Sequence, residues 1–96
     1  MSKVLFSSIA TKDVQEIINY YDEINPQISD VFLDELEETK NFIELHPQAC
    51  VKKLNLIRVR YLKRFKYGVY FKIYHKSITV IGVLHNSRNP QIWKNR

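Results

Sequence analysis

The final stretch of the chain, VLHNSRNPQIWKNR (residues 83–96), gathers side chains that could do chemistry. His85 stands where a hydrophobic strand is expected to end, and an imidazole with an ordinary pKa of about 6.5 suits acid–base work. Arg88 can make bidentate, charge-assisted contacts with a phosphate or a carboxylate. Trp93 and Arg96 complete a basic ending. The segment is therefore either part of a catalytic centre or a docked recognition surface.

The same residues also have structural interpretations. His85 can hydrogen-bond across the strand end, Arg88 can bind a helix carboxylate, and Trp93 can anchor the tail by packing. We favour the structural role for His85 and the functional role for Arg88. His46 and His75 fall in expected loops, and the three histidines show no ligand-like spacing, so neither a metal nor another cofactor is expected.

Charge is divided unevenly between the two halves of the chain. Residues 1–48 hold three Lys/Arg and all ten Asp/Glu, a net −7, whereas residues 49–96 hold twelve Lys/Arg and no acid, a net +12. Strands packed together would concentrate these cations into one field that attracts a polyanion or an acidic protein. The candidate target-binding residues are Lys52, Lys53, Arg58, Arg60, Lys72, Arg88, Trp93 and Arg96.

Length and composition favour one globular domain spanning residues 1–96, because 45% of the residues are hydrophobic and 26% are charged. Cys50 is the only cysteine, so no internal disulfide or CxxC redox pair is possible, which fits a reducing compartment. The opening residues contain too short an apolar run for a signal peptide, and no stretch approaches the ~18 apolar residues of a membrane span. We therefore expect a soluble, cytoplasmic protein with no membrane partner.

Two helices are expected in the first half. Apolar residues recur at helical spacing in residues 11–24, with Thr11 as a possible cap. Asn25 can cap a second helix that starts at Pro26 and runs to about Leu45, where Pro47 ends it. Its acids Asp34, Glu35, Glu37 and Glu38 are expected to face water. The short joint predicts an antiparallel helix hairpin.

Strands account for the rest of the pattern. Residues 3–8 resemble a short strand, and period-two alternation in residues 55–62, 67–74 and 78–85 predicts an antiparallel meander. The fold class is thus α+β, in the order β-α-α-β-β-β, with the helix hairpin packed on one face of a mainly antiparallel sheet.

The alternation also predicts the two faces of that sheet. Val59, Phe71 and Ile73 are expected to face the helices. The opposite face would then carry Arg58 or Arg60 together with Tyr70, Lys72 and Tyr74. Cations interleaved with tyrosines can neutralise phosphates and stack bases, although tyrosines can equally well just cover an open sheet face.

Read in order, these stretches resemble the RelE/ParE superfamily of type II toxin–antitoxin toxins. SSIATKDVQEIINYYDEIN is similar to the opening strand and first helix, and FLDELEETKNFIELHP to the second helix. IRVRYLKRFKYGVYFKIY is similar to the arginine strand with its aromatic segment, and ITVIGVLHNSRNPQIWKNR to the terminal strand and its ending. The motif residues are Leu45, His46 and Pro47, then Phe65, Tyr67 and Tyr70, and finally His85, Arg88, Pro90 and Trp93.

The resemblance implies the RelE/ParE toxin fold and a cognate antitoxin partner, usually acidic or partly disordered. It leaves the target open, because RelE-like members cut mRNA on the ribosome whereas ParE-like members poison DNA gyrase without hydrolysis. A ribonuclease would use His85, Arg60 and Arg88 as catalytic residues. However, no tyrosine follows Tyr74 and no carboxylate follows Glu44, so the ending is closer to the ParE-like pattern.

We therefore predict a ParE-like toxin that inhibits DNA gyrase and is neutralised by its antitoxin. The first alternative is a RelE-like, ribosome-dependent mRNA endoribonuclease. The second is a non-toxic, basic nucleic-acid-binding module.

Overall fold

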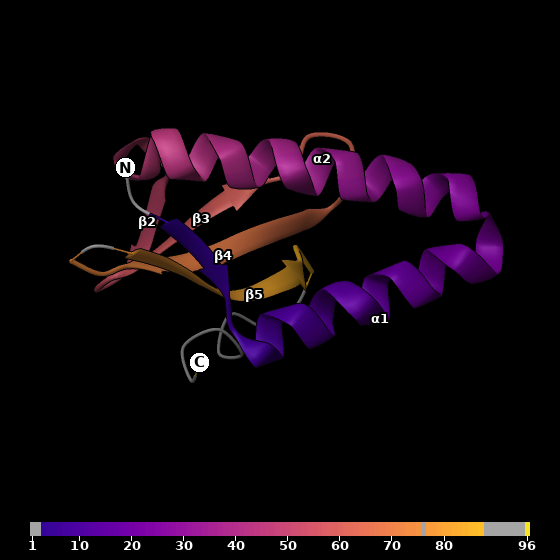
Figure 1. The fold of residues 1–96 in the computed structure, drawn as a ribbon, viewed down its shortest axis with the longest axis horizontal. Coiled ribbons are helices and arrows are strands. Elements are labelled where there is room, and N and C mark those ends of the chain that lie inside the picture. The colour runs from indigo at the N-terminus through magenta and orange to yellow at the C-terminus, as the bar shows by residue number, and fades with distance from the viewer. Residues whose placement is uncertain (1–2, 76, 88–95) are drawn as a thin grey trace.

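The computed structural model describes residues 3–75, 77–87 and 96, and it has two helices and five strands (Figure 1). The elements follow the order β1 (Lys3–Phe6), α1 (Ser8–Ile24), α2 (Pro26–Leu45), the short 3-10 helix η1 (Pro47–Ala49), β2 (Val51–Leu54), β3 (Ile57–Tyr61), β4 (Tyr67–Ile73) and β5 (Ser77–His85). The expected α+β class and helix hairpin are confirmed.

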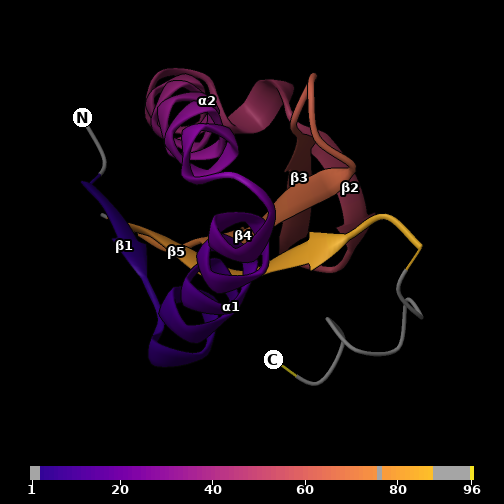
Figure 2. The ribbon, with the colours of Figure 1, turned by 90° about the vertical axis from the view of Figure 1, so that its right-hand side faces the viewer.

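The five strands form one sheet in the order β1-β5-β4-β3-β2, with β1 at one side of the molecule and β2 at the other (Figure 2). β1 pairs in parallel with β5, from Lys3 opposite Ser77 to Phe6 opposite Val80, and every other pairing is antiparallel. Because β1 ends at Phe6, it leaves the last part of β5 without a neighbouring strand on that side.

The first helix begins earlier than the sequence predicted. Ser7 has extended backbone angles, and its hydroxyl accepts the N–H of Ala10 at 3.1 Å, so Ser7 and not Thr11 is the cap. Thr11 lies within the first turn, and its hydroxyl donates to the Ser7 carbonyl at 3.0 Å. For α2 the prediction is confirmed: the Asn25 side chain accepts the N–H of Gln27 at 3.0 Å, Pro26 is the first residue, and the helix ends at Leu45.

Strand β2 was not predicted. Its sequence, VKKL, does not alternate apolar and polar residues, and all four residues are exposed. The period-two pattern that marks a half-buried strand is therefore missing. The strand is formed by its antiparallel pairing with β3, and a tight connection joins the two through Asn55, whose φ of 50° lies in the left-handed region. Asparagine is one of the few residues that adopts this conformation at low cost.

The prediction for the faces of β3 was wrong. Residues directly opposite one another in an antiparallel pair share a face, and Arg58 lies opposite Phe71 while Val59 lies opposite Tyr70. Phe71 belongs to the core cluster that contacts the helices, so Arg58 is on the helix side and Val59 faces away. Alternation separates the two sides of a strand, but only the pairing register decides which side is inward.

Two hydrophobic clusters hold the sheet. The larger one lies between helices and sheet and includes Phe32 and Ile43 of α2, Phe71 of β4 and Val80 of β5. The smaller one lies on the opposite face and contains Ile57, Val59, Tyr70, Ile81 and Leu84. Both faces of the central strands are therefore buried. Burial of the Tyr70 side chain, together with the neighbouring Tyr61, raises the pKa of Tyr70 to about 12.

Candidate functional site

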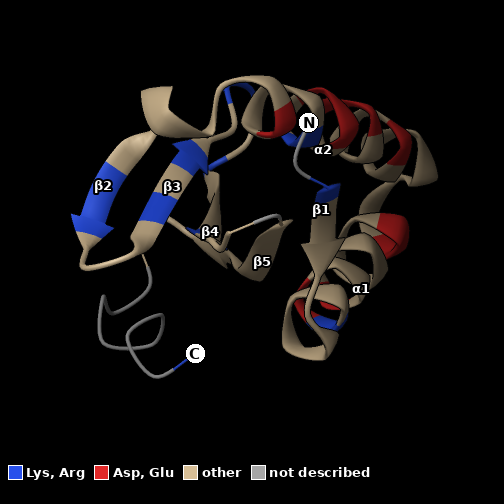
Figure 3. Cartoon of the chain, turned by 60° about the vertical axis from the view of Figure 1, so that its left-hand side comes forward, with Lys and Arg blue, Asp and Glu red and all other residues tan. Residues whose placement is uncertain are grey.

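The charge division of the sequence becomes a division in space. Acidic residues lie along α1 and α2, whereas basic residues gather on β2, on β3 and near the β3–β4 connection (Figure 3). Lys52 and Lys53 are exposed on β2, and the Lys53 ammonium lies 5.5 Å from the centre of the Tyr61 ring. We call β2 and β3 with their connection, residues 51–61, the basic hairpin.

Arg58 stabilises the basic hairpin through hydrogen bonds to the residues that precede β2. Its guanidinium donates to the carbonyl oxygen of Cys50 at 2.9 Å and to the side-chain oxygen of Gln48 at 3.0 Å. These bonds fix the segment that leads into β2, and they leave fewer N–H groups free for a ligand. Arg58 therefore holds the hairpin in shape, whatever it contributes to the field around it.

Arg60 and Lys72, two further candidate residues, lie on opposite faces of the sheet. The guanidinium carbon of Arg60 is 3.7 Å from the centre of the Phe42 ring of α2, a stacking contact that desolvates one side of the cation. Lys72 lies opposite Ile57, on the face away from the helices. Within the basic hairpin, Lys52 and Lys53 are exposed whereas Arg60 is held against the Phe42 ring, and Lys72 of β4 lies on the opposite face of the sheet from Arg60.

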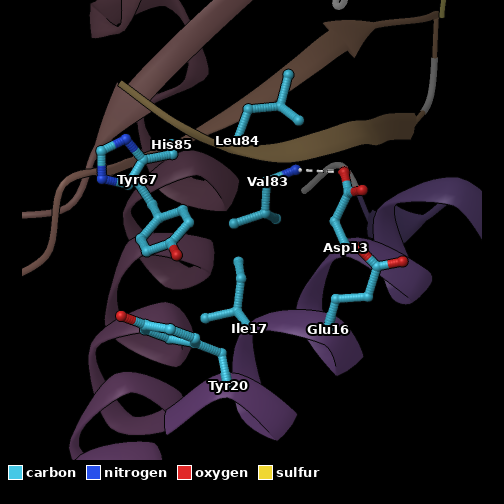
Figure 4. Close-up of a pocket in the computed structure, with 8 residues that line it drawn as sticks. All are labelled: Asp13, Glu16, Ile17, Tyr20, Tyr67, Val83, Leu84 and His85. Carbon is cyan, nitrogen blue, oxygen red and sulfur yellow. Dashed lines mark hydrogen bonds between the residues drawn. The ribbon is translucent and has the colours of Figure 1, made fainter. Parts of the chain in front are cut away.

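His85 lies at the end of β5 beside a hollow of about 190 Å³ between α1 and β5 (Figure 4). Its ring meets the Tyr67 ring edge-on, with the centres 5.2 Å apart. The Nδ1 atom accepts the backbone N–H of Ser87 at 3.1 Å and lies 2.7 Å from the Ser87 hydroxyl. The Nδ1 atom is therefore engaged within the chain.

The lining of this hollow is unsuited to phosphate. Asp13 and Glu16, one helical turn apart on α1, line it together with Tyr20 and Tyr67. Both carboxylates lie on the α1 side of the hollow, across from His85 (Figure 4), and Arg96 offsets the charge of Asp13, so Glu16 supplies the negative charge that disfavours an anion there. The arrangement differs from the positive field that RNA cleavage requires.

Arg96 lies against the same helix. Its guanidinium donates to the carboxylate of Asp13, and that carboxylate also accepts the backbone N–H of Val83 at 3.1 Å (Figure 4). The pair covers the part of β5 that β1 leaves without a neighbour. Gly82 leaves room for this pair, because a Cβ atom at this position would lie 2.8 Å from the Arg96 guanidinium nitrogen and would displace the end of that side chain. Arg88 and Trp93, the remaining candidates, fall outside the described residues.

Sequence reasoning missed Glu35, which was expected to face water. Its side chain is buried on α2 and accepts the backbone N–H groups of Lys63 and Arg64 and the Arg64 guanidinium Nε at 3.0 Å. Burial alone would raise the pKa of Glu35, but these hydrogen bonds and the Arg64 charge outweigh it, so the pKa is lowered. The sequence feature that could have indicated this burial is the position of Glu35, three residues after Phe32 and one before Leu36, beside the buried stripe of the helix.

The described residues hold neither a metal-binding cluster nor a membrane-spanning helix. No group of three or more His, Cys, Asp or Glu side chains in residues 3–75, 77–87 and 96 is arranged to hold a metal ion. Within that same part of the chain, no helix is long and apolar enough to cross a membrane.

The fold defines a class of small α+β protein that is found among toxin–antitoxin structures. A solved structure described as the chromosomal ParDE toxin–antitoxin system from P. aeruginosa superimposes with a TM-score of 0.77 at 18% sequence identity, covering 88% of this chain and 96% of that one. A search of curated protein sequences finds no match. The family model for the ParE toxin of the parDE type II toxin–antitoxin system matches residues 4–90. The chain therefore belongs to the ParE family of type II toxins, which act in partnership with an antitoxin.

Proposed function

We propose that this ParE-family toxin acts in the cytoplasm by inhibiting DNA gyrase, and that a cognate antitoxin neutralises it. The observation that carries the proposal is the family match over residues 4–90, which covers both helices and, apart from Lys3 at the start of β1, all five strands. Gyrase is the target that the ParE-like resemblance implies.

The geometry around His85 supports binding rather than hydrolysis. A general base needs a free lone pair, but the Nδ1 atom of His85 already accepts a hydrogen bond from Ser87. The structure does not bring Arg60 to it, because β4 separates β3 from β5 and the Arg60 guanidinium stacks on the Phe42 ring of α2. Among the described residues that line the hollow beside His85 there is no lysine or arginine, and Glu16 adds a negative charge that disfavours a scissile phosphate.

The basic hairpin supports the antitoxin part of the proposal. Lys52 and Lys53 are exposed there, next to apolar side chains that are also exposed: Val51 at 54%, Leu54 at 40% and Leu56 at 62%. A surface that combines cations with exposed apolar groups suits a protein partner with acidic and apolar residues. Such a partner would cover this hairpin and so compete with other ligands for it.

The test is to express the chain without its antitoxin and follow DNA and protein synthesis over the first minutes. We expect DNA synthesis to fall first while translation continues, and the purified protein to inhibit supercoiling of relaxed plasmid by gyrase. A His85→Gln variant should remain toxic. Early collapse of translation, together with loss of toxicity in His85→Gln, would instead identify the RelE-like ribonuclease.

A further inference from the structure

The connection between β3 and β4, residues 62–66, has a fixed shape and carries three cations. We call it the basic loop. Leu62 is buried in the main core, and its backbone N–H donates to the carbonyl of Tyr67 at 2.9 Å, which closes the loop. The Phe65 ring meets those of Tyr21 and Phe32 edge-on, with centres 5.5 and 5.3 Å away. These two apolar residues anchor the loop on the helix hairpin.

Glu35 holds the other side of the basic loop. Both oxygens of its carboxylate lie within hydrogen-bonding distance of the Arg64 backbone N–H, at 3.1 and 3.2 Å, and the Lys63 N–H donates to the same group. Backbone N–H groups bound to a buried carboxylate have little freedom to rearrange. The loop is also tied to the end of β5, since Asn86 donates its N–H to the Lys66 carbonyl at 2.8 Å.

The surface that results is cationic without being apolar. Lys63, Arg64 and Lys66 are exposed, whereas Leu62 is buried and Phe65 is partly buried against the core. Protein interfaces place apolar residues at their centre, and the basic hairpin offers these while the basic loop does not. A row of cations on a rigid backbone fits instead the phosphates of a nucleic acid, which position a protein without reading sequence.

We propose that Lys63, Arg64 and Lys66 contact DNA phosphates in the target complex, and that Glu35 is the positioning residue that presents them. This inference rests on the proposed function, since DNA bound by gyrase supplies the phosphates. It assigns to the basic loop a role separate from that of the basic hairpin, so the antitoxin and DNA would meet different surfaces. Glu35 acts through the loop backbone and through its contact with the Arg64 guanidinium, and it does not touch DNA.

The first test measures binding to a fluorescein-labelled DNA duplex between 50 and 200 mM salt. The affinity falls as salt rises, and the plot of log affinity against log salt should be less steep for the variant Lys63→Gln/Arg64→Gln/Lys66→Gln. Its slope should be smaller in magnitude by about 2.7, which is about 0.9 for each of the three phosphate contacts. Raising the salt from 50 to 200 mM should therefore weaken DNA binding by the unmodified protein about 40-fold more than it weakens binding by the variant.

The control removes the same number of charges elsewhere: Lys3→Gln/Lys12→Gln/Lys40→Gln, on β1, α1 and α2. It should keep most of the salt slope. Equal losses in the two triple variants would overturn the proposal, because general attraction would then explain the binding. Thermal melting checks that both variants fold; five of the six side chains are exposed and Lys40 is half-exposed, and each triple variant loses one ion pair, Arg64–Glu35 or Lys40–Glu37.

The second test separates positioning from charge. Glu35→Gln removes one negative charge, so charge alone predicts tighter DNA binding. We expect weaker binding, together with faster hydrogen exchange of the Lys63 and Arg64 amides. Asp34→Asn makes the same charge change at an exposed site on the same helix and should bind as well as the unmodified protein, or slightly better. Tighter binding by Glu35→Gln would refute the positioning role.

Gyrase inhibition by the same variants distinguishes the two proposals. If the unmodified protein binds DNA through the basic loop but leaves supercoiling unaffected, the gyrase target is wrong and the DNA contact stands. If it inhibits gyrase while the triple basic-loop variant inhibits equally well, the gyrase target stands and the DNA contact is overturned.

Discussion

Replacing Glu35 with glutamine should destabilise the fold by about 2 kcal/mol at neutral pH. Three donors meet this carboxylate: the backbone N–H groups of Lys63 and Arg64 and the Arg64 Nε. Hydrogen bonds to a charged group contribute roughly 1.5–3 kcal/mol each. The amide oxygen of glutamine can still accept one or two of them, and water can reach the loop because the Arg64 side chain is 56% exposed, so about 2 kcal/mol of the total is lost.

The loss should depend on pH in a defined direction. The pKa of Glu35 is lowered from its ordinary value of 4.5, so the folded state favours the ionised carboxylate. Its contribution is therefore fully present above about pH 4.5 and is lost as the pH falls through the lowered pKa of the folded state. Once the carboxyl is protonated, the unmodified protein resembles the glutamine variant, and the difference in unfolding free energy between them should disappear.

Thermal unfolding followed by circular dichroism measures both effects. A loss of about 2 kcal/mol lowers the melting temperature of a domain of this size by roughly 8–16 °C at pH 7. Asp34→Asn, an exposed neighbour on α2, should change stability by less than about 0.5 kcal/mol. The reasoning is refuted if Glu35→Gln melts within about 2 °C of the unmodified protein at pH 7, or if the gap between them is as large in acid as at neutral pH.

Three further experiments test other features of the structure. Asp13→Ala and Arg96→Ala should each destabilise the domain, and a double-mutant cycle by urea denaturation should give a coupling of about 1 kcal/mol because the pair is largely buried; additive losses would exclude the ion pair. Gly68→Ala should cost roughly 1–3 kcal/mol, since the new Cβ would lie 2.9 Å from a Val59 methyl, and an unchanged melting temperature would contradict this close approach. Burial raises the pKa of the Cys50 thiol, so a thiol reagent at pH 8 should label the folded protein slowly and the urea-unfolded protein at once; equal rates would show that the thiol is accessible.

The local features of the sequence determined the helices and the outline of the sheet. Asn25 and Pro26 start α2 as expected, because a side-chain cap and a proline at the first position act within a few residues. Ser7 was overlooked as the cap of α1 because Thr11, four residues later, offers the same chemistry in sequence. The acid-free second half likewise predicted a basic surface, since no folding arrangement of these residues can neutralise it locally.

The placement of individual charged residues was decided by tertiary structure. Arg58 and Arg60 lie on the helix side of the sheet because the pairing with β4 puts them opposite Phe71 and Val69. The alternation of residues along β3 does not specify that register.

Glu35 shows the same limit for an acid on a helix. It is identical in type to its exposed neighbours on α2, and it is buried only because a loop 28 residues away offers it N–H groups. Asp13 meets Arg96 across 83 residues for the same reason. Periodicity and caps act over one or two turns, so they can be read along the chain. Contacts between distant segments depend on how the helices and strands pack, and that is where this protein fixes its charged side chains.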